Sequence, residues 1–150
     1  MDEILQIAKR HNLIVIEDDA HAVSSEHKGK KIGSIGDLTA FSFYATKNLT
    51  TGEGGMVTTN DEELARKISI LSLHGISQDA WKRYGVRGSW YCEILYPGFK
   101  YNMTDIQASI GLHQLAKIEG FRKTRFQYVK MYQEAFEELL QIKHYKGYED

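Results

Sequence analysis

The sequence predicts an α/β protein with a mostly parallel sheet flanked by helices. Two continuous apolar runs, 13–16 and 38–43, have the composition of strands that are buried on both faces of such a sheet. Helical spacing of apolar residues precedes the first run and reappears after the second. Polar side chains follow both runs, Asp18 after the first and Lys47 after the second. Because open α/β sheets bind ligands at the carboxyl ends of their strands, these two positions predict a ligand site.

The composition is that of a soluble globular protein. Of the 150 residues, 42% are hydrophobic and 26% are charged, and 19 basic side chains balance 20 acidic ones. This balance gives no basic surface for nucleic acid or for an anionic membrane. Cys92 is the single cysteine, so no intramolecular disulfide can form. No apolar stretch reaches the roughly 20 residues that span a bilayer, and the mixed-charge start does not resemble a signal peptide, so a cytoplasmic protein is expected.

The first half of the chain is expected to pass from a helix into a sheet. Apolar residues recur at helical intervals over residues 2–11, and Asn12 can end that helix. The polar segment 23–37, with three glycines, predicts a β-hairpin or a loop. Strands are expected at residues 13–16, 38–43 and 55–59.

The second half is expected to be mainly helical. Asn60 or Asp61 can cap a helix that Gly75 ends, and Thr104 can cap the next helix, over residues 105–118. A long amphipathic C-terminal helix follows, over residues 120–140. The apolar stripes of the first and last of these helices are Leu64, Ile68 and Leu71, and Phe126, Val129, Tyr132, Phe136 and Leu140.

Lys47 lies in the segment FSFYATKNLTTGEGG, between a buried strand and a turn rich in hydroxyls and glycines. A lysine at the end of a buried strand and beside such a turn is suited to act as a reactive amine. Asn48 and the residues up to Gly55 shape the turn around it. Gly54 and Gly55 are expected either to adopt a positive φ or to allow a close approach of backbone.

Two segments of the sequence resemble the DegT/DnrJ/StrS family of pyridoxal-phosphate-dependent sugar aminotransferases. The first is IEDDAHAVSSEHKGKKIGSIGDLTAFSFYATKNLTTGEGGMVTTND, and the second is PGFKYNMTDIQASIGLHQLAKIEGF. The combination of E-D-x-A-H, S-F-x-x-x-K-N and G-E-G-G at these separations is specific. The resemblance implies part of the large domain of a fold type I aminotransferase, pyridoxal 5′-phosphate (PLP) as cofactor, and a homodimer.

The resemblance also implies a role for each site residue. Lys47 would form the Schiff base with PLP and shuttle a proton between carbon atoms. Asp18 would pair with the pyridinium nitrogen, because the family pattern selects it over Asp19. His21 would lie near the ring and its phenolic oxygen, and Ser42 would bind the phosphate. Each residue also has an ordinary structural alternative: a surface lysine, a turn aspartate, a packed histidine and a backbone-bonded serine. No metal site is predicted.

A further phosphate contact is expected from the second segment. Many relatives read G-[YF]-N-Y-R-M there, whereas this chain reads Gly98, Phe99, Lys100, Tyr101, Asn102, Met103. In the family an asparagine in this segment reaches across the dimer interface to the partner's phosphate. Asn102 fits by chemistry and Lys100 fits by position, and both can donate to a phosphate.

The resemblance implies that residues 1–150 are a single partial domain, the central part of the PLP-binding large domain. Relatives are on the order of 370 to 400 residues long. An N-terminal phosphate-binding segment and a C-terminal small domain would be absent, and exposed sheet edges and apolar faces should then cause association.

The functional expectation is transfer of an amino group, with L-glutamate as donor, to a keto group on a nucleotide-linked sugar. A dehydratase of the same fold is disfavoured, because that branch replaces the lysine with histidine. The alternative is a non-catalytic fragment or regulatory homologue that acts as an interaction module. It would use the aromatic-rich loop 75–97, with Trp81, Lys82, Arg83, Tyr84, Arg87, Trp90 and Tyr91.

Overall fold

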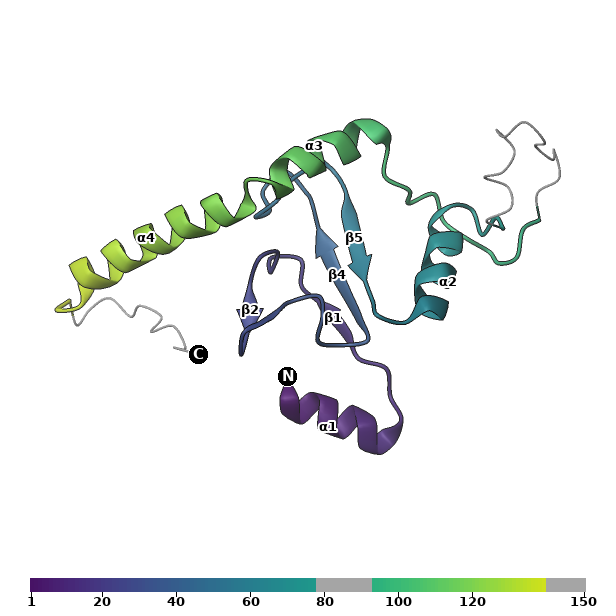
Figure 1. The fold of residues 1–150 in the computed structure, drawn as a ribbon, viewed down its shortest axis with the longest axis horizontal. Coiled ribbons are helices and arrows are strands. Elements are labelled where there is room, and N and C mark those ends of the chain that lie inside the picture. The colour runs from purple at the N-terminus through teal and green to yellow at the C-terminus, as the bar shows by residue number, and fades with distance from the viewer. Residues whose placement is uncertain (78–92, 140–150) are drawn as a thin grey trace.

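The computed structural model describes residues 1–77 and 93–139, which form a three-stranded sheet, a two-stranded hairpin and four helices (Figure 1). The sheet has the order β1-β4-β5, with β1 at Ile16–Asp18, β4 at Leu38–Ser42 and β5 at Gly55–Thr58. β1 runs parallel to β4, and β5 runs antiparallel to β4. The carboxyl ends of β1 and β4 therefore lie at the same edge of the sheet.

Helix α1, Asp2–His11, confirms the first predicted helix. Asn12 ends it in the left-handed conformation, with φ 52°, and its N–H donates to the carbonyls of Ala8 and Lys9. An asparagine tolerates this conformation better than most residues. Asn12 alone was therefore enough to predict the end of the helix.

The prediction of a buried strand at 13–16 was wrong in position and in burial. The ladder starts at Ile16, which pairs with Leu38, and Val15 is tied to the loop before β4 because its N–H donates to Asp37 Oδ2 at 2.7 Å. Leu13 and Ile14 are 60% and 62% exposed. The partner strand sets where β1 begins, and nothing among the described residues covers these two side chains.

The polar segment 23–37 contains the predicted hairpin, formed by β2, Glu26–His27, and β3, Lys30–Lys31. Lys31 joins it to the last helix, because its Nζ lies 2.7 Å from Glu26 and 3.1 Å from Glu119. These contacts raise the pKa of Lys31 and lower the pKa of both carboxyls, chiefly through the hydrogen bonds that the lysine donates. All three side chains are solvated, so the pairs contribute little to stability.

Helix α2, Glu62–Ser72, begins at Asp61, whose side chain accepts a hydrogen bond from Leu64 N at 2.9 Å. Asp61 is therefore the N-cap, rather than Asn60. The buried residue of this helix is Ile70, which the predicted stripe left out. Gly75 follows the helix end with φ 69°, and its N–H donates to Ile70 O at 2.9 Å.

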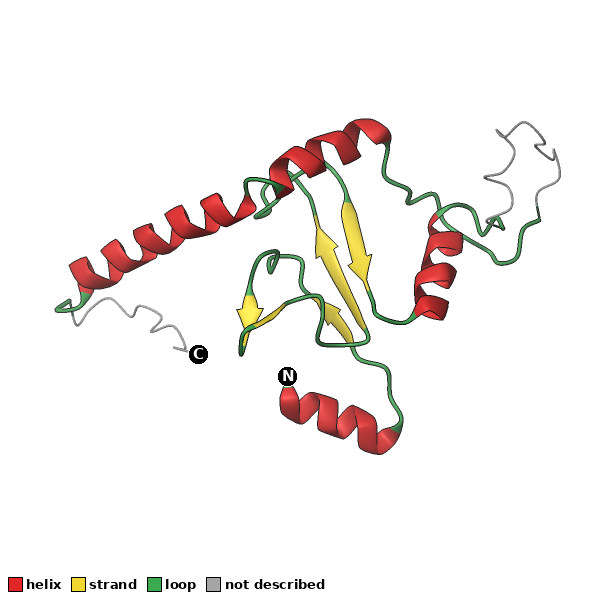
Figure 2. Cartoon of the chain, in the orientation of Figure 1, coloured by secondary structure: helices red, strands yellow, loops and turns green. Residues whose placement is uncertain are grey.

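Helices α3, Asp105–Leu115, and α4, Ile118–Phe136, follow one another with a short break (Figure 2). Thr104 caps α3 in a full capping box with Gln107, as the sequence predicts. α4 starts two residues before the predicted boundary and points away from the sheet (Figure 1).

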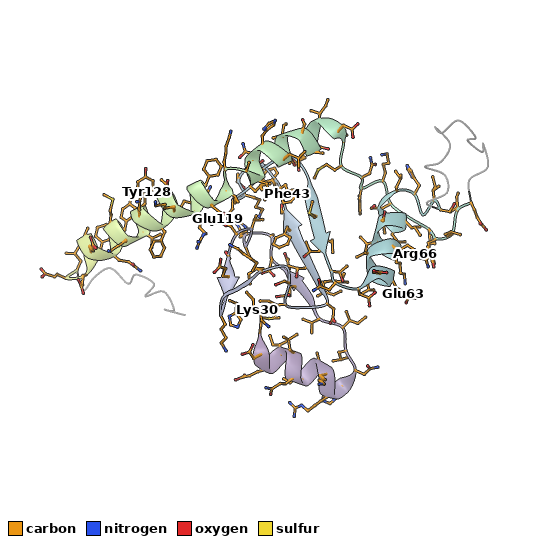
Figure 3. All side chains as sticks on the ribbon, in the orientation of Figure 1. Lys30, Phe43, Glu63, Arg66, Glu119 and Tyr128 are labelled. Carbon is orange, nitrogen blue, oxygen red and sulfur yellow. The ribbon has the colours of Figure 1, made fainter. Side chains whose placement is uncertain are left out.

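The core lies between the sheet, the hairpin segment and the start of α4. Phe43, Leu49 and Ile118 are buried there, and Val23, Phe41, Met103 and Phe121 pack against them. Figure 3 shows Phe43 beneath the α3–α4 junction, whereas Tyr128 lies out along α4. An apolar cavity of about 340 Å³ adjoins this core and is bounded by β4, β5 and α3.

The far part of α4 exposes large apolar side chains. Phe126, Val129 and Tyr132, three residues of the predicted stripe, are 70%, 50% and 63% exposed. Such a surface favours association, in line with the sequence-based expectation of exposed apolar faces. In residues 1–77 and 93–139, no helix combines the length and the hydropathy needed to cross a membrane.

Candidate active site

The candidate site lies where β1 and β4 end. Asp18 is the last residue of β1 and Ser42 the last residue of β4, and Asp18 pairs in register with Ala40. Residues that pair across parallel strands share a face, and side chains two apart along a strand share it too. Asp18 and Ser42 therefore lie on one face of the sheet at its carboxyl edge.

Both polar groups on this face are only weakly engaged by the protein. Asp18 is exposed, and its Oδ1 accepts from Ala20 N at 3.4 Å. Ser42 Oγ accepts from Tyr44 N, also at 3.4 Å. These distances are long for hydrogen bonds, so the carboxylate and the hydroxyl retain capacity for a ligand.

Lys47 and His21 are in direct contact at the same edge. The distance from Lys47 Nζ to His21 Nε2 is 2.7 Å, and Lys47 is half-buried. His21 follows β1, and Lys47 lies in the connection from β4 to β5. Two segments that are 26 residues apart in sequence thus bring an amine and an imidazole together.

The protonation of this pair follows from the chemistry of the two groups. An ammonium can only donate a hydrogen bond, so Lys47 in its charged form requires an unprotonated His21 Nε2. The histidine proton is then on Nδ1.

The turn that carries Lys47 is built from its own hydroxyls and glycines. Thr50 Oγ1 donates to Phe43 O at 3.2 Å and accepts from Gly52 N at 2.9 Å. Gly54 has φ 155°, and a Cβ there would lie 2.5 Å from Thr51 Oγ1. A Cβ on Gly55 would lie 2.9 Å from Phe41 O. The predicted need for glycine at both positions is confirmed.

Glu17 occupies the opposite face of the sheet from Asp18. It is 9% exposed, and its Oε1 accepts from Gly36 N at 2.6 Å and from Thr39 Oγ1 at 3.1 Å. These two bonds give Glu17 a structural role in joining β1 to β4 and to the segment before it.

Asp19 is the third consecutive acid, and its environment differs again. Burial raises its pKa, and the charges of Glu17 and Asp18 add to the shift. Its Oδ2 is buried, with no hydrogen-bond partner among the described residues.

Asn102 is not brought to Lys47. Its Oδ1 accepts a hydrogen bond from Lys100 Nζ, and its Nδ2 donates to Met103 O at 3.5 Å. Lys100 and Asn102, the two candidates for the phosphate contact across a dimer interface, therefore contact each other. Both side chains still carry N–H groups that could donate to a phosphate. The aromatic and basic residues of the predicted interaction loop, Trp81 to Tyr91, lie outside the described residues.

One site residue has a contact that sequence reasoning missed. Asn48 Nδ2 donates to the backbone carbonyl of His21 at 2.6 Å. The sequence places Asn48 in the turn beside Lys47, but its partner lies 27 residues upstream. Only the S-F-x-x-x-K-N signature, which holds the asparagine next to the lysine, pointed to it.

The sequence matches the model of the DegT/DnrJ/EryC1/StrS aminotransferase family over residues 1–148. The chain belongs to this family. Among curated proteins it is 68% identical over 139 residues to an uncharacterized protein of Methanocaldococcus jannaschii and 58% identical over 139 residues to the spore coat polysaccharide biosynthesis protein SpsC of Bacillus subtilis. It is 47% identical over 134 residues to the GDP-perosamine synthase of Caulobacter vibrioides.

The chain spans about a third of the length of these DegT/DnrJ/EryC1/StrS relatives. Each of the first two alignments covers 93% of this chain and 36% of the relative, and the third covers 89% and 33%.

Solved structures of aminotransferases share the fold. Helicobacter pylori PseC, an aminotransferase involved in the biosynthesis of pseudoaminic acid, matches with a TM-score of 0.83 and 30% identity, over 93% of this chain and 35% of that one. The PLP-form of Spr1654 from Streptococcus pneumoniae matches with a TM-score of 0.74 and 40% identity, over 88% and 33%. The neighbours are fold type I aminotransferases, so the predicted fold class is confirmed.

Proposed function

We propose that this chain carries the lysine, the carboxylate and the phosphate-binding hydroxyl of a PLP-dependent sugar aminotransferase. The observation that carries the proposal is the contact of 2.7 Å between Lys47 Nζ and His21 Nε2, at the edge where Asp18 and Ser42 share a face. One amine, one imidazole, one carboxylate and one hydroxyl with spare hydrogen-bonding capacity form a donor set that fits PLP. Family membership and a relative solved in a PLP-form support the cofactor.

PLP supplies an aldehyde for a primary amine and an aromatic ring that accepts electrons from the reacting carbon. With PLP bound, Lys47 Nζ would hold the cofactor covalently and, once freed by a substrate amine, would carry a proton between carbon atoms. Asp18 would hold a proton on the ring nitrogen, because a carboxylate favours the charged form of its partner. Ser42 Oγ would donate to the phosphate. His21, whose ring contacts Lys47, would donate to the phenolic oxygen of the ring.

The substrates of the complete protein are proposed from the relatives. We assign a keto group on a nucleotide-linked sugar as the acceptor, because one relative is named GDP-perosamine synthase and PseC is named for pseudoaminic acid biosynthesis. L-Glutamate is proposed as the amino donor. The shape of the sugar-binding pocket sets the position that is aminated.

We further propose that the complete protein is a cytoplasmic homodimer in which Asn102 or Lys100 of one subunit reaches the other subunit's phosphate. Neither side chain contacts Lys47 among the described residues, which agrees with a role in the active site of the partner subunit. The exposed apolar side chains of α3 and α4 agree with a buried interface. Light scattering measures the oligomeric state, both of this chain and of a longer chain that spans the full length of its relatives.

The cofactor role is tested by covalent trapping. The purified chain is incubated with PLP and reduced with borohydride, and peptide mass spectrometry then locates the modified lysines. We expect modification concentrated on Lys47 and lost in Lys47→Ala, whereas Lys123→Ala, which removes an exposed lysine of α4, behaves as the parent chain. Modification spread evenly over surface lysines, or unchanged in Lys47→Ala, would contradict the proposal. Circular dichroism of each variant checks that the fold is intact.

A further inference from the structure

Two consecutive residues, Lys47 and Asn48, hold the same residue, His21, from two sides. Lys47 Nζ contacts the ring at Nε2 at 2.7 Å, and Asn48 Nδ2 donates to the main-chain carbonyl at 2.6 Å. A carbonyl oxygen can only accept, so the amide nitrogen of Asn48 must face it. One contact acts on the side chain of His21 and the other fixes the backbone from which that side chain extends.

The segment that contains His21 is held by backbone hydrogen bonds and by Val23, which packs against the core. Its turn is closed by Ala22 N donating to Asp19 O at 2.9 Å, and Asp19 N donates to Ala40 O at 2.9 Å. The side chain of His21 is exposed, and its ring makes no second hydrogen bond within the described residues. Without the Asn48 contact, the position of the ring would depend on one hydrogen bond to a long lysine side chain, which has many rotamers.

The segment that contains Asn48 is anchored as well. Leu49 is 3% exposed and belongs to the core with Phe43 and Ile118. Lys47 N donates to Tyr44 O at 3.0 Å, and Thr51 N donates to Phe43 O at 3.0 Å. Asn48 therefore extends from an anchored turn towards His21.

We propose that Asn48 is a positioning residue that holds His21 against Lys47 and so selects the histidine tautomer protonated on Nδ1. The inference rests on the proposed function for its catalytic meaning, since Lys47 is the reacting amine there. With Nε2 unprotonated, the imidazole accepts from the Lys47 ammonium and can later receive one of its protons. The asparagine itself touches neither the reacting atoms nor the amine.

The tautomer is measured directly, in the chain without cofactor. Nitrogen-15 NMR of the histidine rings distinguishes protonated from unprotonated Nδ1 and Nε2. We expect His21 in the parent chain to be protonated on Nδ1, and Lys47→Ala to return it to the mixture found in free histidine. Asn48→Ala should produce the same return although Lys47 is still present. Asn48→Asp keeps the size but replaces the donor with an acceptor, and should behave as Asn48→Ala.

Asn60→Ala serves as the control, because Asn60 is an exposed asparagine far along the chain from His21 and the site turn. A His21 spectrum that is unchanged in both Asn48 variants would overturn the inference, as would a change of equal size in Asn60→Ala. Dispersed spectra with other resonances unmoved show that the variants are folded.

A second readout links the geometry to reactivity. Asn48→Ala should slow the trapping of PLP on Lys47 by about five- to tenfold, the effect of losing one hydrogen bond that orders the site. Failure of PLP trapping in the parent chain would count against the proposed function alone, because the tautomer measurement needs no cofactor. A normal trapping rate in Asn48→Ala together with an unchanged tautomer would reject the positioning role.

Discussion

Glu17 and Asp18 are neighbours in the sequence with identical charge, yet they lie on opposite faces of the sheet and differ in burial and hydrogen bonding. Glu17 is 9% exposed and accepts two hydrogen bonds from the segment before β4 and from β4 itself. Asp18 is exposed, and its carboxylate accepts one hydrogen bond from the part of the chain that the structure describes, at 3.4 Å. The protein itself supplies hydrogen-bond donors to the Glu17 carboxylate. The Asp18 carboxylate keeps its capacity to accept hydrogen bonds from a ligand. The difference separates a residue that builds the sheet from one that serves the site.

The largest effect should come from removing the enclosed carboxylate. Glu17→Ala should lower the free energy of unfolding by about 3 kcal/mol, because it leaves the buried Thr39 hydroxyl and the half-buried Gly36 N–H without an acceptor. Urea denaturation followed by circular dichroism measures the loss. Glu63→Ala on α2 removes an exposed carboxylate and should cost less than about 1 kcal/mol. Equal losses in the two variants would mean that burial does not separate the faces.

Adding a methyl group next to the buried Glu17 side chain should have the next largest effect on stability. A Cβ on Gly36 would lie 2.5 Å from Glu17 Oε1, so Gly36→Ala should cost about 1–3 kcal/mol, as overpacking does. Once Glu17 has been changed to alanine, the same methyl group has room. The double variant should therefore lose less than the sum of the single losses. Strict additivity in the denaturation series would show that the two positions do not share this space.

On the open face, substitution should affect binding rather than folding. Asp18→Asn should change the free energy of unfolding by less than about 0.5 kcal/mol, because the side chain is exposed and weakly bonded. It should weaken PLP binding by about tenfold or more, since an amide cannot hold a proton on the ring nitrogen. Equilibrium dialysis with PLP and urea denaturation give the two numbers. A loss of stability comparable with that of Glu17→Ala would remove the distinction between the faces.

The smallest effect is expected at Asp19, and it depends on pH. Burial raises the pKa of this carboxyl in the folded state above its ordinary value of 3.8. The folded chain then binds more protons than the unfolded chain, so stability falls as pH rises through the folded pKa. Asp19→Asn removes that loss and should raise stability at pH 7 by less than about 1 kcal/mol. Thermal unfolding at pH 7 and near pH 3 should show a gain at the first and none at the second.

The features that the sequence predicted best depend on neighbouring residues. Asn12 ends α1, Thr104 caps α3 and the glycines of the Lys47 turn take their expected roles, because each interaction spans only a few residues. The position of β1 was missed for the opposite reason. Asp37 and Leu38, more than 20 residues downstream, decide where that strand starts.

By itself, the sequence determined the α/β class, the helix end at Asn12, the cap at Thr104 and the family, and through the family the candidates Lys47, Asp18, His21, Ser42 and either Asn102 or Lys100. These follow from periodicity, local hydrogen bonding and motif spacing, which are all contained in short segments. Only the tertiary structure decided that Glu17 is enclosed while Asp18 is open, and that Asn48 and Lys47 both hold His21. Those outcomes depend on pairing between distant segments, because the register of β1 against β4 fixes which side chains meet.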